Sequence, residues 1–213
     1  MRKPKRPSND AVPGDGDIHG AALKDSLASP ALVRVRLARI PSKAEVEMWM
    51  ARWPDLDGQF GRGHTARLER SLVQWISTEG KTGFRSAWVI ALLSSRGLLV
   101  THPEVGLMQA WHAAKDSGCR RECLRALLHL DLSDGALEEL LEWATQVVFL
   151  NDVPVAFLHH ALRVMDRAIS RPGFLQTHRF GGDLHEALIH LGHVDGSVHF
   201  KKKAALLRAR LSS

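Results

Sequence analysis

The segment from His185 to His190 contains the residue types of a metal-dependent hydrolase. A histidine is followed by Glu186 and then by a second histidine, which is close to the zinc-protease pattern. That pattern needs two histidines four residues apart on one helix face, with the glutamate as general base. Here the histidines are five residues apart, so they point about 140° away from each other around a helix. The spacing therefore does not predict a zinc protease.

A wider set of histidines near the C-terminus could hold a metal ion only if loops 171–183 and 192–197 folded together. The set consists of His178, His185, His190, His193 and His199. We favour surface or helix-capping roles for these side chains. The sequence therefore assigns no metal ligand and no cofactor to this region.

The residues Asp55-Leu56-Asp57-Gly58 begin like a calcium-binding loop. Such a loop needs glycine at its sixth position and a bidentate glutamate at its twelfth. Phe60 and Ala66 stand at those positions. We therefore interpret the segment as a turn without a metal.

Cys119 and Cys123, the only cysteines, are four residues apart and would share one face of a helix. We interpret them as reduced, buried thiols, because a metal site would need two further ligands. No glycine-rich phosphate loop occurs, and no serine or cysteine lies in a recognisable nucleophile motif with a histidine. The sequence therefore predicts no catalytic residue and a protein that is not an enzyme.

Helices must position any functional residues, because after Gly63 apolar residues recur at helical spacing in one segment after another. Turn residues separate these segments, and no strand pattern appears after residue 63. Trp75, Trp88, Trp111 and Trp143 lie on the apolar stripes, so we predict that they pack in the core. The predicted helices are 64–79, 84–96, 104–115, 119–129, 135–149, 154–170, 183–191 and 198–211.

The chain before residue 64 divides into two parts. Residues 1–20 are rich in proline, glycine and charged residues with little to bury, which predicts a disordered basic tail. Residues 21–63 are expected to form N-terminal helices and a loop that pack on the first repeat. Two short helices are predicted within 31–50, and the loop is marked by Pro54, Gly58, Gly61 and Gly63.

The helical segments also repeat. Residues 72–75 (LVQW) are similar to residues 140–143 (LLEW), and the second helix of each pair begins near residue 84, 119, 154 or 198. A period of about 35 residues in helix pairs is typical of solenoid proteins. The sequence therefore predicts one helical-repeat domain over residues 64–213.

Residues 84–88 (FRSAW), 119–127 (CRRECLRAL), 153–156 (VPVA) and 200–204 (FKKKA) carry a family resemblance. With the repeat pattern of residues 31–211, they resemble small bacterial HEAT-like, armadillo-type helical-repeat proteins of uncharacterised function. The resemblance implies an all-α fold, an α-solenoid of antiparallel helix pairs wound as a right-handed superhelix. It implies no activity.

Charge is distributed unevenly over the chain. The net charge of +6 comes from the two ends, since residues 7–200 alone have a net charge of −3. The first helices of the pairs have a net charge of −5 and the second helices a net charge of +10. A solenoid that lines its concave side with second helices would make that side basic. The residues predicted to bind a partner there are Arg85, Arg121, Arg125, Arg163 and Lys202.

We therefore expect a cytoplasmic, non-catalytic scaffold that binds an acidic protein or peptide through a basic concave face. Binding of nucleic acid or ribonucleoprotein by the same face is the first alternative. A DNA-base repair enzyme on a HEAT-like scaffold is the second alternative. It would need a carboxylate beside an aromatic cleft, and Trp88 has no acidic neighbour on its own helix. No apolar run approaches the ~20 residues of a membrane span, so we expect no membrane partner.

Overall fold

The computed structural model describes residues 26–39, 41–78, 80–177, 181–193 and 198–212. Within these ranges the regular elements are all helices, and no residue lies in a strand. The predicted all-α class is therefore confirmed. The tail predicted for residues 1–20 lies outside the described ranges.

The two short N-terminal helices are present. Helix α2 (Pro30–Ala38) begins after Ser29, whose hydroxyl accepts the N–H of Leu32. Helix α3 (Lys43–Arg52) begins with a capping box, in which Ser42 and Glu45 each accept the other's backbone N–H. Such caps satisfy N–H groups that have no partner inside the helix.

The loop predicted from Pro54 onward is wrong in its first half. The short helix η1 (Trp53–Asp55) and helix α4 (Leu56–Phe60) occupy it, and the turn begins only at Gly61. Proline fits the first turn of a helix, where its missing N–H costs nothing. Burial of Trp53 and Leu56 stabilises these helical turns, although α4 contains Gly58.

The remaining helices agree with the predicted segments to within a few residues, and the short helix α11 is an addition that the periodicity did not indicate. Their bounds are α5 (His64–Ile76), α6 (Lys81–Ser95), α7 (Glu104–Ala113), α8 (Ser117–Leu127), α9 (Asp134–Val147), α10 (Val155–Ser170), α11 (Phe174–Thr177), α12 (Gly181–His193) and α13 (Val198–Leu211).

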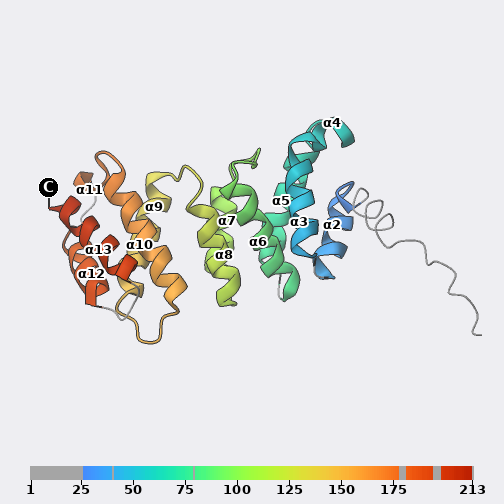
Figure 1. Ribbon diagram of the computed structural model, residues 1–213. Coiled ribbons are helices and arrows are strands. Elements are labelled where there is room, and N and C mark those ends of the chain that lie inside the picture. Colours follow the sequence, from blue (N-terminus) through green and yellow to red (C-terminus); the bar gives the residue numbers. More distant parts are fainter. Residues whose placement is uncertain (1–25, 40, 79, 178–180, 194–197, 213) are drawn as a thin grey trace, which may run out of the picture.

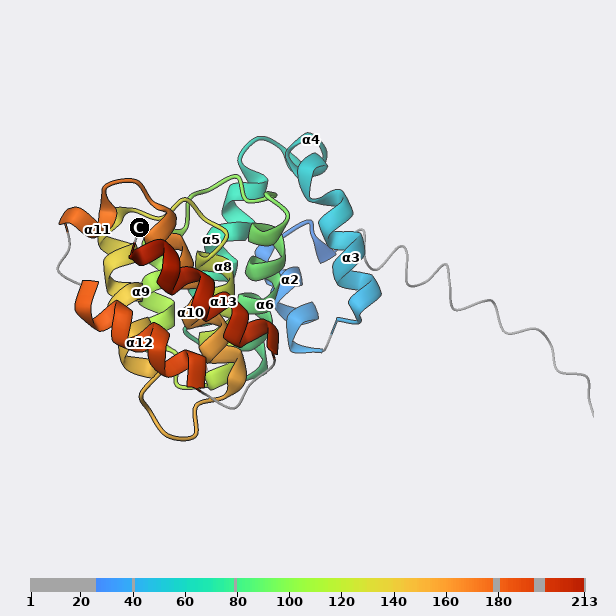
Figure 2. The ribbon, with the colours of Figure 1, turned by 60° about the vertical axis from the view of Figure 1, so that its left-hand side comes forward.

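The helices pack in the order of the chain. Helix α5 packs on α6, α7 on α8, α9 on α10 and α12 on α13. The second helices also pack on one another in sequence, α6 on α8, α8 on α10 and α10 on α13. Figure 1 shows the result, with α2 and α3 at one end of the molecule and α12 and α13 at the other. Figure 2 brings α12 and α13 forward, where they cover α9 and α10.

The core runs through all of these helices, and the tryptophans contribute to it unequally. Trp75 and Trp111 are buried, as predicted, whereas Trp88 and Trp143 are only half-buried. Trp143 contacts Trp111 edge to face, with ring centroids 5.7 Å apart. The prediction of a core position is therefore confirmed for two of the four side chains, and Trp88 is left partly on the surface.

Glu69 is a charged residue inside the core. It is fully buried on α5, and its carboxylate accepts hydrogen bonds from Trp53 Nε1 (3.3 Å), the N–H of Val100 (2.8 Å) and the N–H and hydroxyl of Thr101 (2.8 and 2.6 Å). A buried carboxylate is tolerated when donors surround it in this way. Glu69 thus joins η1, α5 and the α6–α7 loop, and it contributes no charge to the surface.

None of the helices in the described ranges combines the length and the apolar character that crossing a membrane requires.

Candidate partner-binding surface

Four arginines lie on neighbouring helices with helical spacing. Arg121 and Arg125 are one turn apart on α8, and Arg163 and Arg167 are one turn apart on α10. Residues at this spacing share a helix face, and none of the four side chains is buried. Because α8 packs on α10, the two pairs can form one surface. We name these four residues the arginine strip.

Two histidines show that the halves of the arginine strip are close together. The pKa of His160 is lowered to about 4, first by burial and then by the charges of Arg163, Arg121 and Arg125. The pKa of His129 is also lowered by burial and by arginines of the strip, and its Nε2 atom lies 3.5 Å from a nitrogen of Arg163. Charges on α8 and α10 therefore act on the same small region.

The arginines also repel one another. Burial and the charge of Arg125 lower the pKa of Arg163. Burial lowers the pKa of Arg167, and Arg171 and Arg163 lower it further, while Asp131 acts in the opposite direction. Like charges held this close raise the free energy of the folded state.

A single buried carboxylate faces the α8 half of the arginine strip. Glu122 is 4% exposed, and its Oε1 atom accepts from Nε and Nη2 of Arg121 at 3.3 and 3.2 Å. Its Oε2 atom lies 2.8 Å from Nη2 of Arg125. One negative charge thus lies against two positive charges, and the strip as a whole stays positive.

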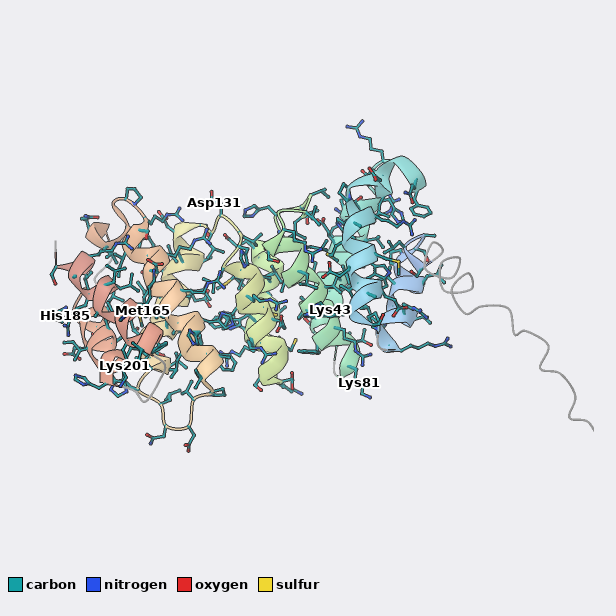
Figure 3. The ribbon with its side chains drawn as sticks, in the orientation of Figure 1. Lys43, Lys81, Asp131, Met165, His185 and Lys201 are labelled. Atoms are coloured by element: carbon teal, nitrogen blue, oxygen red, sulfur yellow. The ribbon has the colours of Figure 1, made fainter. Side chains whose placement is uncertain are left out.

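The far end of the arginine strip is tied to the loop after α8. Arg167 donates to the carbonyl oxygens of Leu128 (3.2 Å) and Leu130, and it lies 3.9 Å from the carboxylate of Asp131. These contacts with the loop give Arg167 a structural role as well as a place in the strip. Figure 3 shows Asp131 of this loop at one end of the helices and Lys81, the first residue of α6, at the opposite end.

The structure brings together three of the five predicted binding residues, Arg121, Arg125 and Arg163. Arg85 is 9% exposed, and its guanidinium donates to the carbonyl oxygens of Leu37 and Ala38 (3.1 Å to the second), which end α2. Its charge is therefore directed into the molecule. Lys202 is exposed on α13, and no interaction joins it to the arginine strip among the described residues.

A surface cavity of about 1060 Å³ lies beside the arginine strip, between the first turns of α6 and α8. Phe84 and Trp88, one turn apart on α6, form its apolar wall. Arg121 and Glu122 on α8 line the opposite side. We name it the aromatic cavity, and Arg121 belongs both to it and to the strip.

The described residues offer little for metal or covalent chemistry. Among them no group of three or more histidine, cysteine, aspartate or glutamate side chains could hold a metal ion. His178 lies outside the described residues, as does the side chain of His199. Cys119 and Cys123 are free and buried, as predicted. Hydrogen bonding with Cys119, together with burial, raises the pKa of Cys123, which keeps it a thiol.

Sequence reasoning did not identify His160, Arg167 or the aromatic cavity. The spacing of His160, Arg163 and Arg167 on one helix face was a usable signal, because three cationic or titratable groups recur at intervals of three and four residues. The cavity had no such signal. It joins Trp88 to Glu122 from helices more than thirty residues apart, and only packing of α6 on α8 brings them together.

Comparison with known proteins gives no relative, since no protein-family model, curated protein or solved structure matches this chain. Function must therefore be inferred from the surface itself.

Proposed function

We propose that the chain is a HEAT-like α-solenoid, an armadillo-type fold of antiparallel helix pairs wound as a right-handed superhelix. The packing order supports this architecture, because each helix pair contacts mainly the pairs before and after it. Neighbour-only contacts and a repeat of about 35 residues are typical of helical-repeat proteins.

We propose that this solenoid is a non-catalytic scaffold that binds an acidic protein or peptide through the arginine strip. The observation that carries the proposal is the crowding of positive charge where α8 packs on α10, with a nitrogen of Arg163 3.5 Å from Nε2 of His129. Burial, and after it the charges of Arg163, Arg121 and Arg125, lower the pKa of His160 to about 4. Folding alone gains nothing from placing Arg125 and Arg163 close together. An anionic partner would remove the repulsion and would be attracted by the combined field.

Unsatisfied polar atoms on the same surface agree with this proposal. The Nε atom of Arg125 and the Nδ1 atom of His160 are buried without a hydrogen-bond partner among the described residues. Such atoms are costly in free energy, and native proteins retain few of them. A small movement of the Arg125 side chain would offer its Nε–H to a carboxylate of a partner.

Nucleic acid is the second candidate partner, because Phe84 and Trp88 lie beside arginines and could stack on bases. The same cavity meets the geometric requirement of the base-repair hypothesis, since Glu122 lies across from Trp88. The carboxylate of Glu122 is, however, engaged by Arg121 and Arg125. A carboxylate held in two ion pairs is a poor general base, so we favour binding over catalysis.

We propose that the protein acts in the cytoplasm. Cys119 and Cys123 are buried free thiols, and a reducing compartment maintains thiols in that state.

A charge-reversal experiment tests the proposed partner class. Binding of a labelled polyglutamate peptide and of a labelled single-stranded oligonucleotide is measured by fluorescence anisotropy for the wild type, Arg163→Glu and Arg62→Glu. Arg62 is exposed in the turn before α5, away from the arginine strip, so it controls for net charge. We expect the peptide to bind and Arg163→Glu alone to weaken it about tenfold. Binding of the oligonucleotide only would support the second candidate instead.

A further inference from the structure

We propose that the aromatic cavity is an anchor pocket for one large apolar side chain, aromatic by preference, of the same acidic partner. The partner's carboxylates would lie on the arginine strip while this side chain enters the cavity. The inference rests on the proposed function and adds to it the chemistry of the recognised segment, an aromatic residue next to acidic residues.

The cavity and the arginine strip are continuous. Arg121 lines the cavity and also acts electrostatically on His160 of α10. Its side chain therefore lies where the apolar wall ends and the positive surface begins. A peptide that places a carboxylate near Arg121 brings its neighbouring side chain to the mouth of the cavity.

The wall of the cavity suits an aromatic group. Phe84 and Trp88 are half-buried, and the described residues leave this part of their rings uncovered. Aromatic rings gain free energy by edge-to-face or offset contacts in addition to burial of apolar surface. The volume of about 1060 Å³ is ample for one large side chain, and aromatic anchors in pockets supply much of the affinity of protein interfaces.

The charges around the cavity favour a peptide over a nucleic-acid strand. A single strand carries a phosphate on every nucleotide and needs basic groups along its whole path. On the α6 side of the cavity the guanidinium of Arg85 is bonded to the end of α2, and the exposed Lys81 adds a single positive charge at the start of the helix rather than a continuous basic path. The cavity wall also includes the carboxyl groups of Asp116 and Glu122. An apolar residue followed by acidic residues fits this arrangement, whereas a uniformly charged strand does not.

The test uses two labelled peptides with the full-length protein. One peptide has a single phenylalanine flanked on both sides by glutamates, and the other has alanine in its place. Ser117→Trp fills the cavity from an exposed position at the start of α8. Ser95→Trp, at the exposed end of α6, is the matched control. Trp88→Leu, which removes the larger of the two aromatic side chains of the wall, serves as the second variant if Ser117→Trp does not fold.

We expect the phenylalanine peptide to bind the wild type and Ser95→Trp about tenfold more tightly than the alanine peptide. Ser117→Trp should abolish this preference, whereas Arg163→Glu should weaken both peptides and preserve it. Equal binding of the two peptides to the wild type, with both weakened by Arg163→Glu, would overturn the anchor pocket and leave the proposed function intact. If neither peptide binds, the proposed function fails and the pocket with it. Binding of an oligonucleotide alone, sensitive to Ser117→Trp, would assign the cavity to stacked bases and overturn the inference.

Discussion

Glu69 and Glu122 are both buried carboxylates, but different groups stabilise them. Neutral donors from η1 and from the α6–α7 loop surround Glu69, and no arginine is among them. Glu122 depends instead on Arg121 and Arg125, which are themselves partly exposed. The first carboxylate therefore belongs to the core, and the second couples the core to the candidate binding surface.

Replacing Glu69 tests its structural role. Glu69→Ala would leave Trp53 Nε1, the N–H of Val100 and the N–H of Thr101 without an acceptor. Only the bond from Trp53 is fully buried, and the N–H groups of Val100 and Thr101 can turn to water. Because a buried unsatisfied donor costs about 1–3 kcal/mol, we expect the free energy of unfolding to fall by about 1–3 kcal/mol in urea titrations. Glu142→Ala, an exposed change on α9, should alter it by about 0.5 kcal/mol or less. Equal stability of the two variants would contradict the buried network.

His160 makes stability depend on pH. In the folded protein its pKa is about 4, below the ordinary value of 6.5. As the pH falls from 6.5 toward 4, the unfolded chain binds a proton at this site and the folded protein does not, so stability is lost over that window. The full shift corresponds to about 3 kcal/mol, which solvent screening of the half-exposed ring reduces to about 1 kcal/mol.

His160→Gln should remove this contribution. We expect the free energy of unfolding of the variant to fall about 1 kcal/mol less than that of the wild type between pH 6.5 and 4.5. Urea unfolding over this pH range measures the difference, and His185→Gln on α12 is the control. Parallel pH profiles for His160→Gln and the wild type would show that neither burial nor the arginines lower the pKa of this ring.

At the scale of single residues, sequence patterns identified some members of the surface and not others. Arg121, Arg125 and Arg163 could be predicted because they lie on polar faces of amphipathic helices. The burial of Arg85 could not be predicted from the sequence, since it depends on where the end of α2 packs against α6. Local periodicity contains no information about contacts between segments that are forty-eight residues apart.

At the scale of elements, the long helices followed from apolar periodicity, while the short ones did not. Helix α4 and η1 contain Pro54 and Gly58, which locally favour a turn, and only tertiary burial of Trp53 and Leu56 decides the outcome. The helix predicted from residue 84 begins three residues earlier, so Gly83 lies inside α6. Its position is explained by packing, because a Cβ atom there would meet the carbonyl oxygens of Thr78 and Ile76.

Two glycine substitutions separate packing from helix propensity. In Gly83→Ala the new Cβ would lie 2.9 Å from the carbonyl oxygen of Ile76 and closer still to that of Thr78, and backbone atoms cannot easily move aside. We expect a loss of about 1–3 kcal/mol in thermal or urea unfolding. Gly135→Ala, in open space near the start of α9, should be neutral or should gain up to about 1 kcal/mol. A stabilising effect at both sites would mean that α6 does not approach the end of α5 so closely.

At the scale of the whole molecule, the net charges of the helix sets overstate the positive field. Lys203 and Arg210 of α13 both pair with Asp166 of α10, at 2.7 and 2.9 Å, so their charges are held against a carboxylate. Arg85 is buried, and Glu69 does not reach the surface. The repulsion that remains uncompensated is concentrated where α8 faces α10. The sequence could predict the sign of this surface, but its location depends on which charges the fold neutralises.

The arginines of the strip differ in their surroundings, so reversing their charges should have different effects on stability. Reversing Arg121 and Arg125 together would surround the 4% exposed Glu122 with negative charge. Loss of the partners of a buried charge typically costs about 3–5 kcal/mol, so we expect Arg121→Glu/Arg125→Glu to lose much of its stability in urea unfolding. Arg163→Glu removes a repulsion from Arg125 instead, so its stability should stay within about 1 kcal/mol of the wild type.

Arg163→Glu should affect partner binding much more than it affects the stability of the fold. Each positive charge that a partner neutralises adds to the salt dependence of its association, because screening weakens exposed charge pairs. Arg163→Glu should therefore bind a glutamate-rich peptide about tenfold less tightly at low salt and lose less affinity than the wild type as salt is raised. Anisotropy titrations at several salt concentrations measure both quantities on a variant that stays folded. If Arg163→Glu keeps the affinity and the salt dependence of the wild type, the arginine strip is not the contact surface, and its crowded charge must then be a tolerated cost of packing α8 on α10.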